Sequence, residues 1–236
     1  MGVVRRLLWK EEPVVDSPDI NWGIDAVSAT RQNGENAASI EHDGETYRVQ
    51  YANSRDDQWT AAYGRAISSG TLRAFVLREG SLIWTKTLER PFTSAIGTDG
   101  TSVFLSGGDS RSLGNVVYAF GPNGEQLLED SLDSNCSSIA VSDDGRYGAV
   151  VSKQPDCKIH VYDLTAQTKL DTYDPVEEGM GLLAFQEWSG ELRLYVSAEN
   201  ASEPLYAIDM EGETVWQSKR LIQRTPYFTR LMNKYR

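Results

Sequence analysis

Three stretches of the chain align with one another without a gap: SAIGTDG at residues 94–100, IAVSDDG at 139–145 and AFQEWSG at 184–190. Their final glycines, Gly100, Gly145 and Gly190, are 45 positions apart in both steps. Each stretch is an apolar segment that runs into a turn, and a second apolar segment follows it. Asp-Gly or Ser-Gly between two such segments is typical of a β-hairpin, because the turn needs a positive φ that glycine adopts without steric cost. The sequence therefore predicts a repeated hairpin.

A second hairpin follows the first in every copy. Its third-strand segments begin VYAFGPNGEQLL, VYDLTAQTKLDT and LYAIDMEGETVW, and their tyrosines, Tyr118, Tyr162 and Tyr206, are 44 positions apart. The turn positions of this hairpin keep the same spacing of 44, at Gly80, Gly124, Thr168 and Gly212. Two independent landmarks with nearly one period predict a repeat of four short antiparallel strands.

The first copy is irregular. Residues 37–44, AASIEHDG, match the opening hairpin, but Gly44 lies 56 positions before Gly100. We interpret the surplus as a loop insertion within residues 54–69. The units are then 36–90, 91–133, 134–175 and 176–219, with an N-terminal extension at 1–35 and a basic C-terminal tail or helix at 220–236.

The repeats resemble known β-propeller blades. IAVSDDGRYGAVVS, followed by IHVYDLTAQTKL, is similar to the WD40-like and YVTN-like repeats, whereas VVYAFGPNGEQLL and LYAIDMEGETVW look more like PQQ-like blades. The resemblance covers residues 36–219 and implies an all-β propeller whose blades bury their flanks against each other. It places the three tyrosines in the layers between blades, and Trp84 and Trp216 near the outer strands.

The number of blades stays open at this point. Four blades are recognisable, and the 35 residues before them and 17 after them are enough to contribute a fifth. NWGIDAVSATR near the N-terminus and RLIQR near the C-terminus are the candidate strands, and we slightly favour five blades over four. A third alternative is a partial propeller that a partner or a second copy completes, since an unclosed stack of sheets exposes apolar flanks.

Charge is distributed unevenly along the chain. Of the net charge of −11, residues 1–10 and 219–236 hold nine basic residues and no acid, so the remainder carries −20. The chain has 16 Arg and only 7 Lys, which with the acid excess resembles proteins of high-salt organisms. An acidic body repels nucleic acid at long range, while the basic ends suit an anionic partner.

The two ends are the first candidate contact sites. Thr225 and Pro226 suit the start of a helix, after which apolar residues recur on one face with basic residues beside it. Such a helix docks on a partner, or else covers the chain's own propeller. The predicted partner-binding residues at the ends are Arg5, Arg6, Trp9, Arg224, Phe228, Arg230, Leu231, Lys234 and Tyr235. On the predicted loop insertion we add Trp59 and Tyr63, because propeller loops carry most binding functions.

Little in the sequence points to catalysis. His42 and His160 are the only histidines and Cys136 and Cys157 the only cysteines, so neither a zinc site nor a His-based triad is expected. We expect two reduced thiols rather than a disulfide. The acidic pairs Asp56–Asp57 and Asp143–Asp144 lack the ligand spacing of a calcium loop. We therefore assign no catalytic residue, metal or cofactor.

The expected function is a non-catalytic protein-interaction scaffold that docks on a larger assembly through its basic ends and the loop insertion. No stretch approaches the roughly 20 apolar residues of a membrane helix, and the N-terminus does not resemble a signal peptide, so we expect a cytoplasmic protein. A propeller enzyme, quinoprotein-like or hydrolytic, is the alternative that the PQQ-like blades favour. Attachment to nucleic acid or a ribosome through the basic ends is a third possible function.

Overall fold

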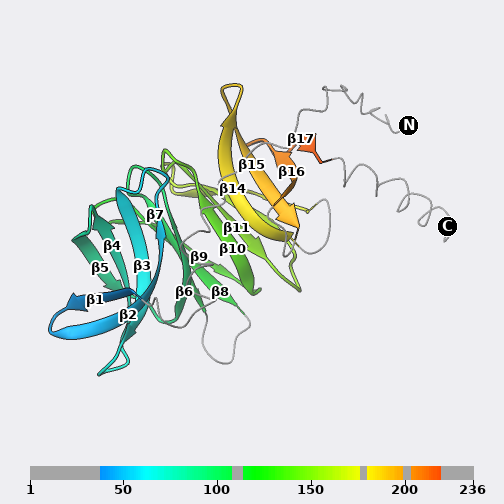
Figure 1. The fold of residues 1–236 in the computed structure, drawn as a ribbon. Helices are drawn as coiled ribbons and strands as arrows, with labels where there is room; N and C mark the ends of the chain where they lie inside the picture. Colours follow the sequence, from blue (N-terminus) through cyan, green and yellow to red (C-terminus); the bar gives the residue numbers. More distant parts are fainter. Residues whose placement is uncertain (1–37, 108–113, 176–179, 199–202, 219–236) are drawn as a thin grey trace, which may run out of the picture.

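The structure is a computed structural model that describes residues 38–107, 114–175, 180–198 and 203–218. Within these ranges the chain is all-β, with seventeen strands in four antiparallel sheets and no helix (Figure 1). Accordingly, no helix in the described part of the chain is long and apolar enough to cross a membrane.

Each sheet is a simple meander in which every strand pairs with the next one along the chain. Sheet one contains β1 (Ala38–His42), β2 (Glu45–Asn53), β3 (Trp59–Ala66), β4 (Leu72–Arg78) and β5 (Ser81–Thr87). Sheet two contains β6 (Pro91–Ile96), β7 (Ser102–Gly107), β8 (Asn115–Phe120) and β9 (Gln126–Leu132). Sheet three contains β10 (Cys136–Val141), β11 (Tyr147–Ser152), β12 (Ile159–Asp163) and β13 (Thr168–Tyr173). Sheet four contains β14 (Met180–Trp188), β15 (Glu191–Ala198), β16 (Pro204–Ile208) and β17 (Thr214–Gln217).

The four sheets stand side by side in chain order, with sheet one and sheet four at opposite ends of the row (Figure 1). They touch mainly through their inner strands: β6 packs on β2 and β3, β10 on β6 and β7, and β14 on β10 and β11. A twisted four-stranded sheet that packs its flanks on like neighbours is a propeller blade. The predicted β-propeller architecture is therefore confirmed, with four blades among the described residues.

Each pair of neighbouring sheets shares one hydrophobic core. Between sheets one and two the core includes Trp59, Val76, Trp84, Phe104 and Phe120. The core between sheets two and three includes Leu105, Val117, Val150, Tyr162 and Leu164, and the core between sheets three and four includes Val151, Val161, Leu194, Val196 and Tyr206. Sheets two and three bury their apolar side chains only against their neighbours, whereas sheets one and four each also hold a cluster of their own.

The three repeat tyrosines occupy equivalent places, as the sequence predicted. Tyr118, Tyr162 and Tyr206 lie on β8, β12 and β16, the third strand of their sheets. Each one packs into the core shared with the preceding sheet. Trp84 and Trp216 lie on the outer strands β5 and β17, also as expected.

The predicted loop insertion at residues 54–69 is wrong. Residues Trp59–Ala66 form β3, which pairs with β2 on one side and β4 on the other. The extra element is β1, an additional strand that forms a hairpin with β2 at Gly44. The turn that corresponds to Gly100 and Gly145 is therefore the turn after β2, where Asp57 takes the positive φ of 57°. The period is preserved, but a carboxylate side chain replaces the glycine that would have marked it.

The third copy of the second turn also differs by one residue. Thr168, the predicted turn position, is the first residue of β13, and Gln167 has the positive φ of 58°. Because Gln167 and Asp57 adopt a positive φ without being glycine, a search for turn glycines does not find these two turns. The predicted fifth blade, N-terminal extension and C-terminal helix lie outside the described residues.

Candidate functional site

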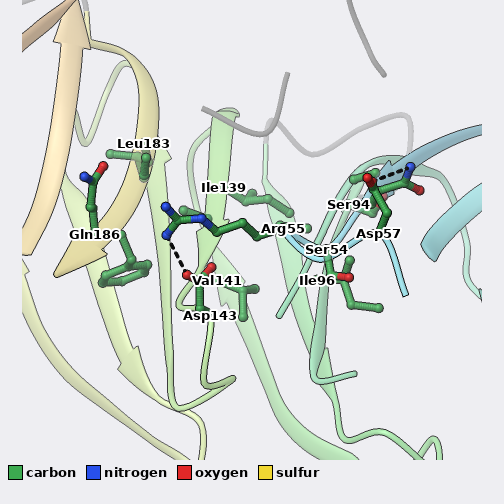
Figure 2. A pocket seen from close by; sticks show the side chains of 16 residues that line it. Ser54, Arg55, Asp57, Ser94, Ile96, Ile139, Val141, Asp143, Leu183 and Gln186 are labelled. Atoms are coloured by element: carbon green, nitrogen blue, oxygen red, sulfur yellow. Dashed lines mark hydrogen bonds and ion pairs between the residues drawn. The ribbon is translucent and has the colours of Figure 1, made fainter. Parts of the chain in front are cut away.

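The ends of one strand from each sheet, together with the turns that follow, surround a groove of about 290 Å³, which we call the inner groove (Figure 2). It is lined mainly by β2, β6, β10 and β14 and by the turns that follow them. The lining residues are Ala52, Asn53, Ser54, Arg55, Asp57, Ser94, Ala95, Ile96, Ile139, Ala140, Val141, Asp143, Leu183, Ala184, Phe185 and Gln186. Alanine, isoleucine, valine and leucine residues form much of the lining, but the surface that the groove exposes is mostly polar. The polar groups come from the turns and from Asn53, Ser94 and Gln186 on the strands.

The turns after β2 and β10 have the same internal geometry. In the first, the Ser54 hydroxyl donates to Asp56 Oδ1 at 2.6 Å and accepts from the Trp59 backbone N–H at 3.0 Å. In the second, the Ser142 hydroxyl donates to Asp144 Oδ1 at 2.6 Å and accepts from the Tyr147 backbone N–H at 2.8 Å. A serine followed two residues later by aspartate thus closes each turn through its own side chains.

An ion pair crosses the inner groove. Arg55 extends from the turn of sheet one to Asp143 in the turn of sheet three, with 2.9 Å between Nη1 and Oδ2 (Figure 2). The pair passes over sheet two, and both side chains are about half exposed. An exposed pair of this kind contributes at most about 1 kcal/mol to stability. This ion pair therefore adds little to the stability of the fold and is easily broken.

The backbone beneath the ion pair is fixed by sheet two. The backbone N–H and the hydroxyl of Thr98 both donate to the Asp143 carbonyl, at 2.8 and 2.7 Å. Gly145 lies against the Asp99 carboxylate so closely that a Cβ on it would overlap the Asp99 side chain. Asp143 is thus held by its main chain while its carboxylate stays in the groove.

The end of the molecule that carries the groove is strongly acidic. The turns that follow β2, β4, β6, β8, β10, β12, β14 and β16 hold ten acidic residues and two arginines, Arg55 and Arg146, and we call this end the turn face. The acidic residues are Asp56, Asp57, Glu79, Asp99, Glu125, Asp143, Asp144, Asp209, Glu211 and Glu213. The hydrogen bond from the Ser54 hydroxyl lowers the pKa of Asp56 below its ordinary value, so this carboxylate is charged at neutral pH.

The two acidic pairs in the turns have structural partners. Asp56 and Asp144 accept hydrogen bonds within their own turns, and Asp143 pairs with Arg55. Across the described ranges, no group of three or more His, Cys, Asp and Glu side chains could hold a metal ion. The turn carboxylates are therefore candidates for contact with a cationic partner.

A serine–histidine–aspartate cluster in sheet three was not anticipated from the sequence. His160 Nε2 lies 3.1 Å from Ser152 Oγ and 3.0 Å from Asp156 Oδ2, and His160 is only 4% exposed. Both partners contact the same imidazole nitrogen, whereas a catalytic relay needs the nucleophile on one nitrogen and the carboxylate on the other. The only hint in the sequence is the even spacing of four residues. We therefore interpret the cluster as a structural contact within sheet three that joins Ser152, Asp156 and His160.

The cysteines are two free thiols. Burial raises the pKa of the Cys136 thiol to about 12, so it is protonated at neutral pH. Since the thiolate is the reactive form, Cys136 is not a nucleophile in this structure. The two cysteines do not form a disulfide with each other in the structure.

The structure changes the setting of the predicted partner-binding residues. Trp59 and Tyr63 lie on β3 and are 7% and 8% exposed, within the core between sheets one and two. They are not loop residues. The other predicted partner-binding residues lie outside the described ranges. They are Arg5, Arg6, Trp9, Arg224, Phe228, Arg230, Leu231, Lys234 and Tyr235. Arg55 and Asp143, which are 88 residues apart, were not predicted to meet, because only the stacking of sheets brings their turns together.

Comparison with known proteins yields matches to solved structures only. No protein-family model matches the chain, and no curated protein does. The chain is similar to the β-propeller domain of Cps50 (Swd1) from Myceliophteria thermophila, with 8% identity, a TM-score of 0.48, and coverage of 70% of this chain and 54% of that domain.

Two further structures are similar to the same extent. The β-propeller domain of the Trilobed protease from Pyrococcus furiosus has 10% identity and a TM-score of 0.43, with 72% of this chain and 58% of that one covered. The C-terminal WD40 domain of Sif2 has 13% identity and a TM-score of 0.44, with 75% and 49% covered. The matches thus span only about half to three-fifths of the solved propellers. The arrangement of its own four sheets is what gives this chain a β-propeller fold.

Proposed function

We propose that the protein is a non-catalytic interaction module that holds a basic segment of a protein partner in the inner groove. The observation that supports this most is the combination of the groove with the acidic turn face around it. The groove is about 290 Å³ in volume, and its mostly polar lining includes the Asp143 side chain and several aliphatic side chains. A lysine or arginine side chain fits such a site, since its alkyl stem packs on aliphatic side chains while its charge meets a carboxylate.

The electrostatics of the turn face supports a cationic partner in two ways. Ten acidic residues against two arginines attract positive charge at long range and repel the phosphates of nucleic acid. At short range, Arg55 occupies Asp143 in the unbound protein and must be displaced. The exchange costs little, because an exposed ion pair is worth at most about 1 kcal/mol.

The test is binding of a fluorescein-labelled lysine- and arginine-rich decapeptide, followed by fluorescence anisotropy at fixed salt. Arg55→Gln removes the competing cation and is expected to tighten binding about threefold to tenfold, whereas Asp143→Asn weakens it by a similar factor. The matched control is Asp133→Asn, because Asp133 is an exposed acid at the opposite end of the sheets. It should change the affinity less than twofold. Equal affinities for Asp143→Asn and the unmodified protein would refute the proposal.

We also propose that the basic ends provide a second contact with an anionic surface of the assembly. The support is the charge separation in the sequence, where nine basic residues at the ends accompany a body of net charge −20. Removing residues 220–236 should abolish recovery of partners in a pull-down and leave peptide binding in the groove unchanged. If the truncation instead tightens peptide binding, the C-terminal segment occupies the groove of its own chain, and the proposed second contact is wrong.

A further inference from the structure

The β1–β2 hairpin covers the free flank of sheet one, at the end of the row (Figure 1). Phe75 on β4 is 0% exposed, although its side chain faces away from sheet two, unlike its neighbours Ala74 and Val76. Two aromatic rings lie against it, with the centroid of Tyr47 on β2 at 5.0 Å and that of His42 on β1 at 6.0 Å. Because β2 and β3 separate β1 from β4 in the sheet order, the contact with His42 requires sheet one to curl. The hairpin is therefore a cap on this flank.

Gly64 on β3 permits this curl. A Cβ on Gly64 would lie 2.1 Å from the Arg48 carbonyl oxygen of β2, so another residue would not fit without a shift of the backbone. Glycine within a strand is typical of a tight bend or of two backbones in close approach. Ala62 and Ala66, the next residues on the same side of β3, are each 1% exposed. The small residues of β3 thus let β1 and β2 fold over toward β4.

Asp43 and Gly44 form the two-residue turn at the tip of this hairpin. They lie between the paired residues His42 and Glu45, and their φ values are 51° and 76°. The Asp43 carboxylate is 3.0 Å from His42 Nε2 and 3.9 Å from Arg73 Nη2 of β4, and the Asp43 side chain is 69% exposed. Apart from its own chain neighbours, nothing lies within 4 Å of the Cβ position of Gly44. The tip of the hairpin is thus exposed, and Gly44 is not held by packing.

The chain contains three Asp-Gly steps, and the one at the hairpin tip is the least restrained. In the other two, the N–H groups of Gly100 and Gly145 donate to the carbonyl three positions earlier, at 3.2 and 2.9 Å. The carboxylates of Asp99 and Asp144 also accept a backbone N–H, at 2.8 and 3.1 Å. Within the described residues, the Gly44 N–H has no bond of this kind. The step at the tip is therefore open to attack of the glycine nitrogen on the aspartate side chain.

We propose that Asp43 is a site of spontaneous isomerisation to isoaspartate. The Gly44 backbone nitrogen attacks Asp43 Cγ, which it can approach because glycine has no Cβ to shield its main chain. A Cγ–N bond forms and the Cγ–O bond breaks, and the hydroxyl of the carboxylic acid leaves with the amide proton as water. A second water molecule then opens the cyclic imide at the original main-chain carbonyl, so that the backbone continues through Cγ. The reaction needs no oxidant, reductant or cofactor.

The isomerised residue does not fit this hairpin. Isoaspartate lengthens the backbone by one methylene group within a turn of only two residues. The length of that turn fixes the pairing of His42 with Glu45, so the pairing is lost and the His42 ring moves away from Phe75. Isomerisation thus releases the cap and exposes the flank of sheet one. The change is independent of the function proposed for the inner groove, which contacts the opposite end of β2.

The test is peptide mapping of the full chain after incubation for several weeks in mildly acidic buffer. Isoaspartate is identified by its changed retention and its electron-transfer fragments, because isomerisation does not alter the mass. Asp43 should isomerise about tenfold faster than Asp99 or Asp144, the matched internal controls, since hydrogen bonds restrain both of those turns. Equal rates at the three positions overturn the proposal, and so does isomerisation of Asp43 that occurs only in urea-unfolded protein.

A single tryptic peptide tests the release of the hairpin. Cleavage at the flanking arginines yields residues 32–48, which contain both Asp43 and Tyr47. After hydroxyl-radical labelling of the incubated protein, oxidation of Tyr47 should be several times higher in the isoaspartate form than in the aspartate form, since Tyr47 is 1% exposed in the intact hairpin. Tyr162, also 1% exposed, is the control and should stay as protected as in fresh protein. Equal oxidation of Tyr47 in the two forms would mean that the hairpin accommodates the longer turn and that the proposed release is wrong.

Discussion

At the residue scale, turn glycines in this protein also serve as contact surfaces for the neighbouring sheet. Gly100 has a φ of +92°, and a Cβ built on it would lie 2.8 Å from the ring of Trp59 in sheet one. Gly124 is similarly placed against Trp84. The absence of a side chain therefore satisfies two requirements together, the positive φ of the turn and the close approach of an aromatic ring.

These two requirements are separable by mutation. Gly190 has a φ of +82° but nothing within 4 Å of its Cβ position, so Gly190→Ala reports the cost of the positive φ alone. Gly100→Ala adds the overlap with Trp59, and we expect it to lower the free energy of unfolding by about 1–3 kcal/mol more than Gly190→Ala. Urea denaturation of both variants measures the difference. Equal losses would show that the ring moves aside freely.

His160 makes stability depend on pH. Burial lowers the pKa of its imidazole below the ordinary value, with Lys169 contributing, while the nearby Asp156 and Asp130 carboxylates oppose the shift. The folded state therefore favours the neutral ring. Below about pH 6.5 the unfolded chain binds a proton that the folded chain resists.

The free energy of unfolding should accordingly be at its full value above pH 6.5 and fall as the pH is lowered through that value. Urea unfolding between pH 5 and 8 measures the slope, and His160→Gln should reduce it. The change of the unfolding free energy with pH also tests whether the Ser152–Asp156–His160 cluster has a structural role. If His160→Gln left the slope unchanged, other groups would account for it.

At the scale of elements, sheet one shows how an added strand differs from an inserted loop. β3 pairs with β2 and β4 along its length, and Ala61 and Ala62 on it are 0% and 1% exposed. The connection from β3 to β4 is exposed, with Ile67 at 65%. Only the second of these segments has room for extra residues.

Insertions of four residues, Gly-Ser-Gly-Ser, distinguish the two segments. An insertion after Ala62 interrupts a central strand and should prevent folding, as seen by loss of the cooperative unfolding transition. The same insertion after Ser68 lengthens a surface connection and should cost less than about 1 kcal/mol, because the entropy of closing a longer loop grows slowly. If both insertions were tolerated, residues 59–66 would not be a central strand in solution.

At the scale of the whole molecule, stability depends on pairs of neighbouring sheets. Val151 of sheet three and Val196 of sheet four belong to one core cluster, whereas Val76 belongs to the cluster between sheets one and two. Contacts within a shared cluster are coupled, while distant sites add independently.

A comparison of double mutants tests this organisation. Val151→Ala and Val196→Ala together should deviate from the sum of the single losses by about 0.5 kcal/mol or more, whereas Val76→Ala and Val196→Ala should add within about 0.5 kcal/mol. Chemical denaturation of the single and double variants supplies all the values. Coupling of equal size in both pairs would mean that the sheets form one undivided core.

Much of the fold followed from the sequence because its turns are marked locally. Gly100, Gly145 and Gly190 are spaced by the length of one sheet unit, and each has the positive φ that the pattern required. The tyrosines of β8, β12 and β16 lie in the layers between sheets as expected, since a strict period places equivalent residues in equivalent layers. Where Asp57 and Gln167 adopt the positive φ in place of glycine, the sequence does not mark the turn, and the opening hairpin of the first unit was assigned to residues 37–51 instead of to β2 and β3.

The sequence by itself determined the repeat, the antiparallel strands and the unequal charge of body and ends, because turn conformation, strand alternation and charge are properties of neighbouring residues. Only the tertiary structure decided which side chains meet across sheets. Arg55 and Asp143 come together, and Trp59 and Tyr63 are buried, because of the order and angle at which the sheets stack. That stacking depends on the combined shape of two flanks, which no single repeat encodes.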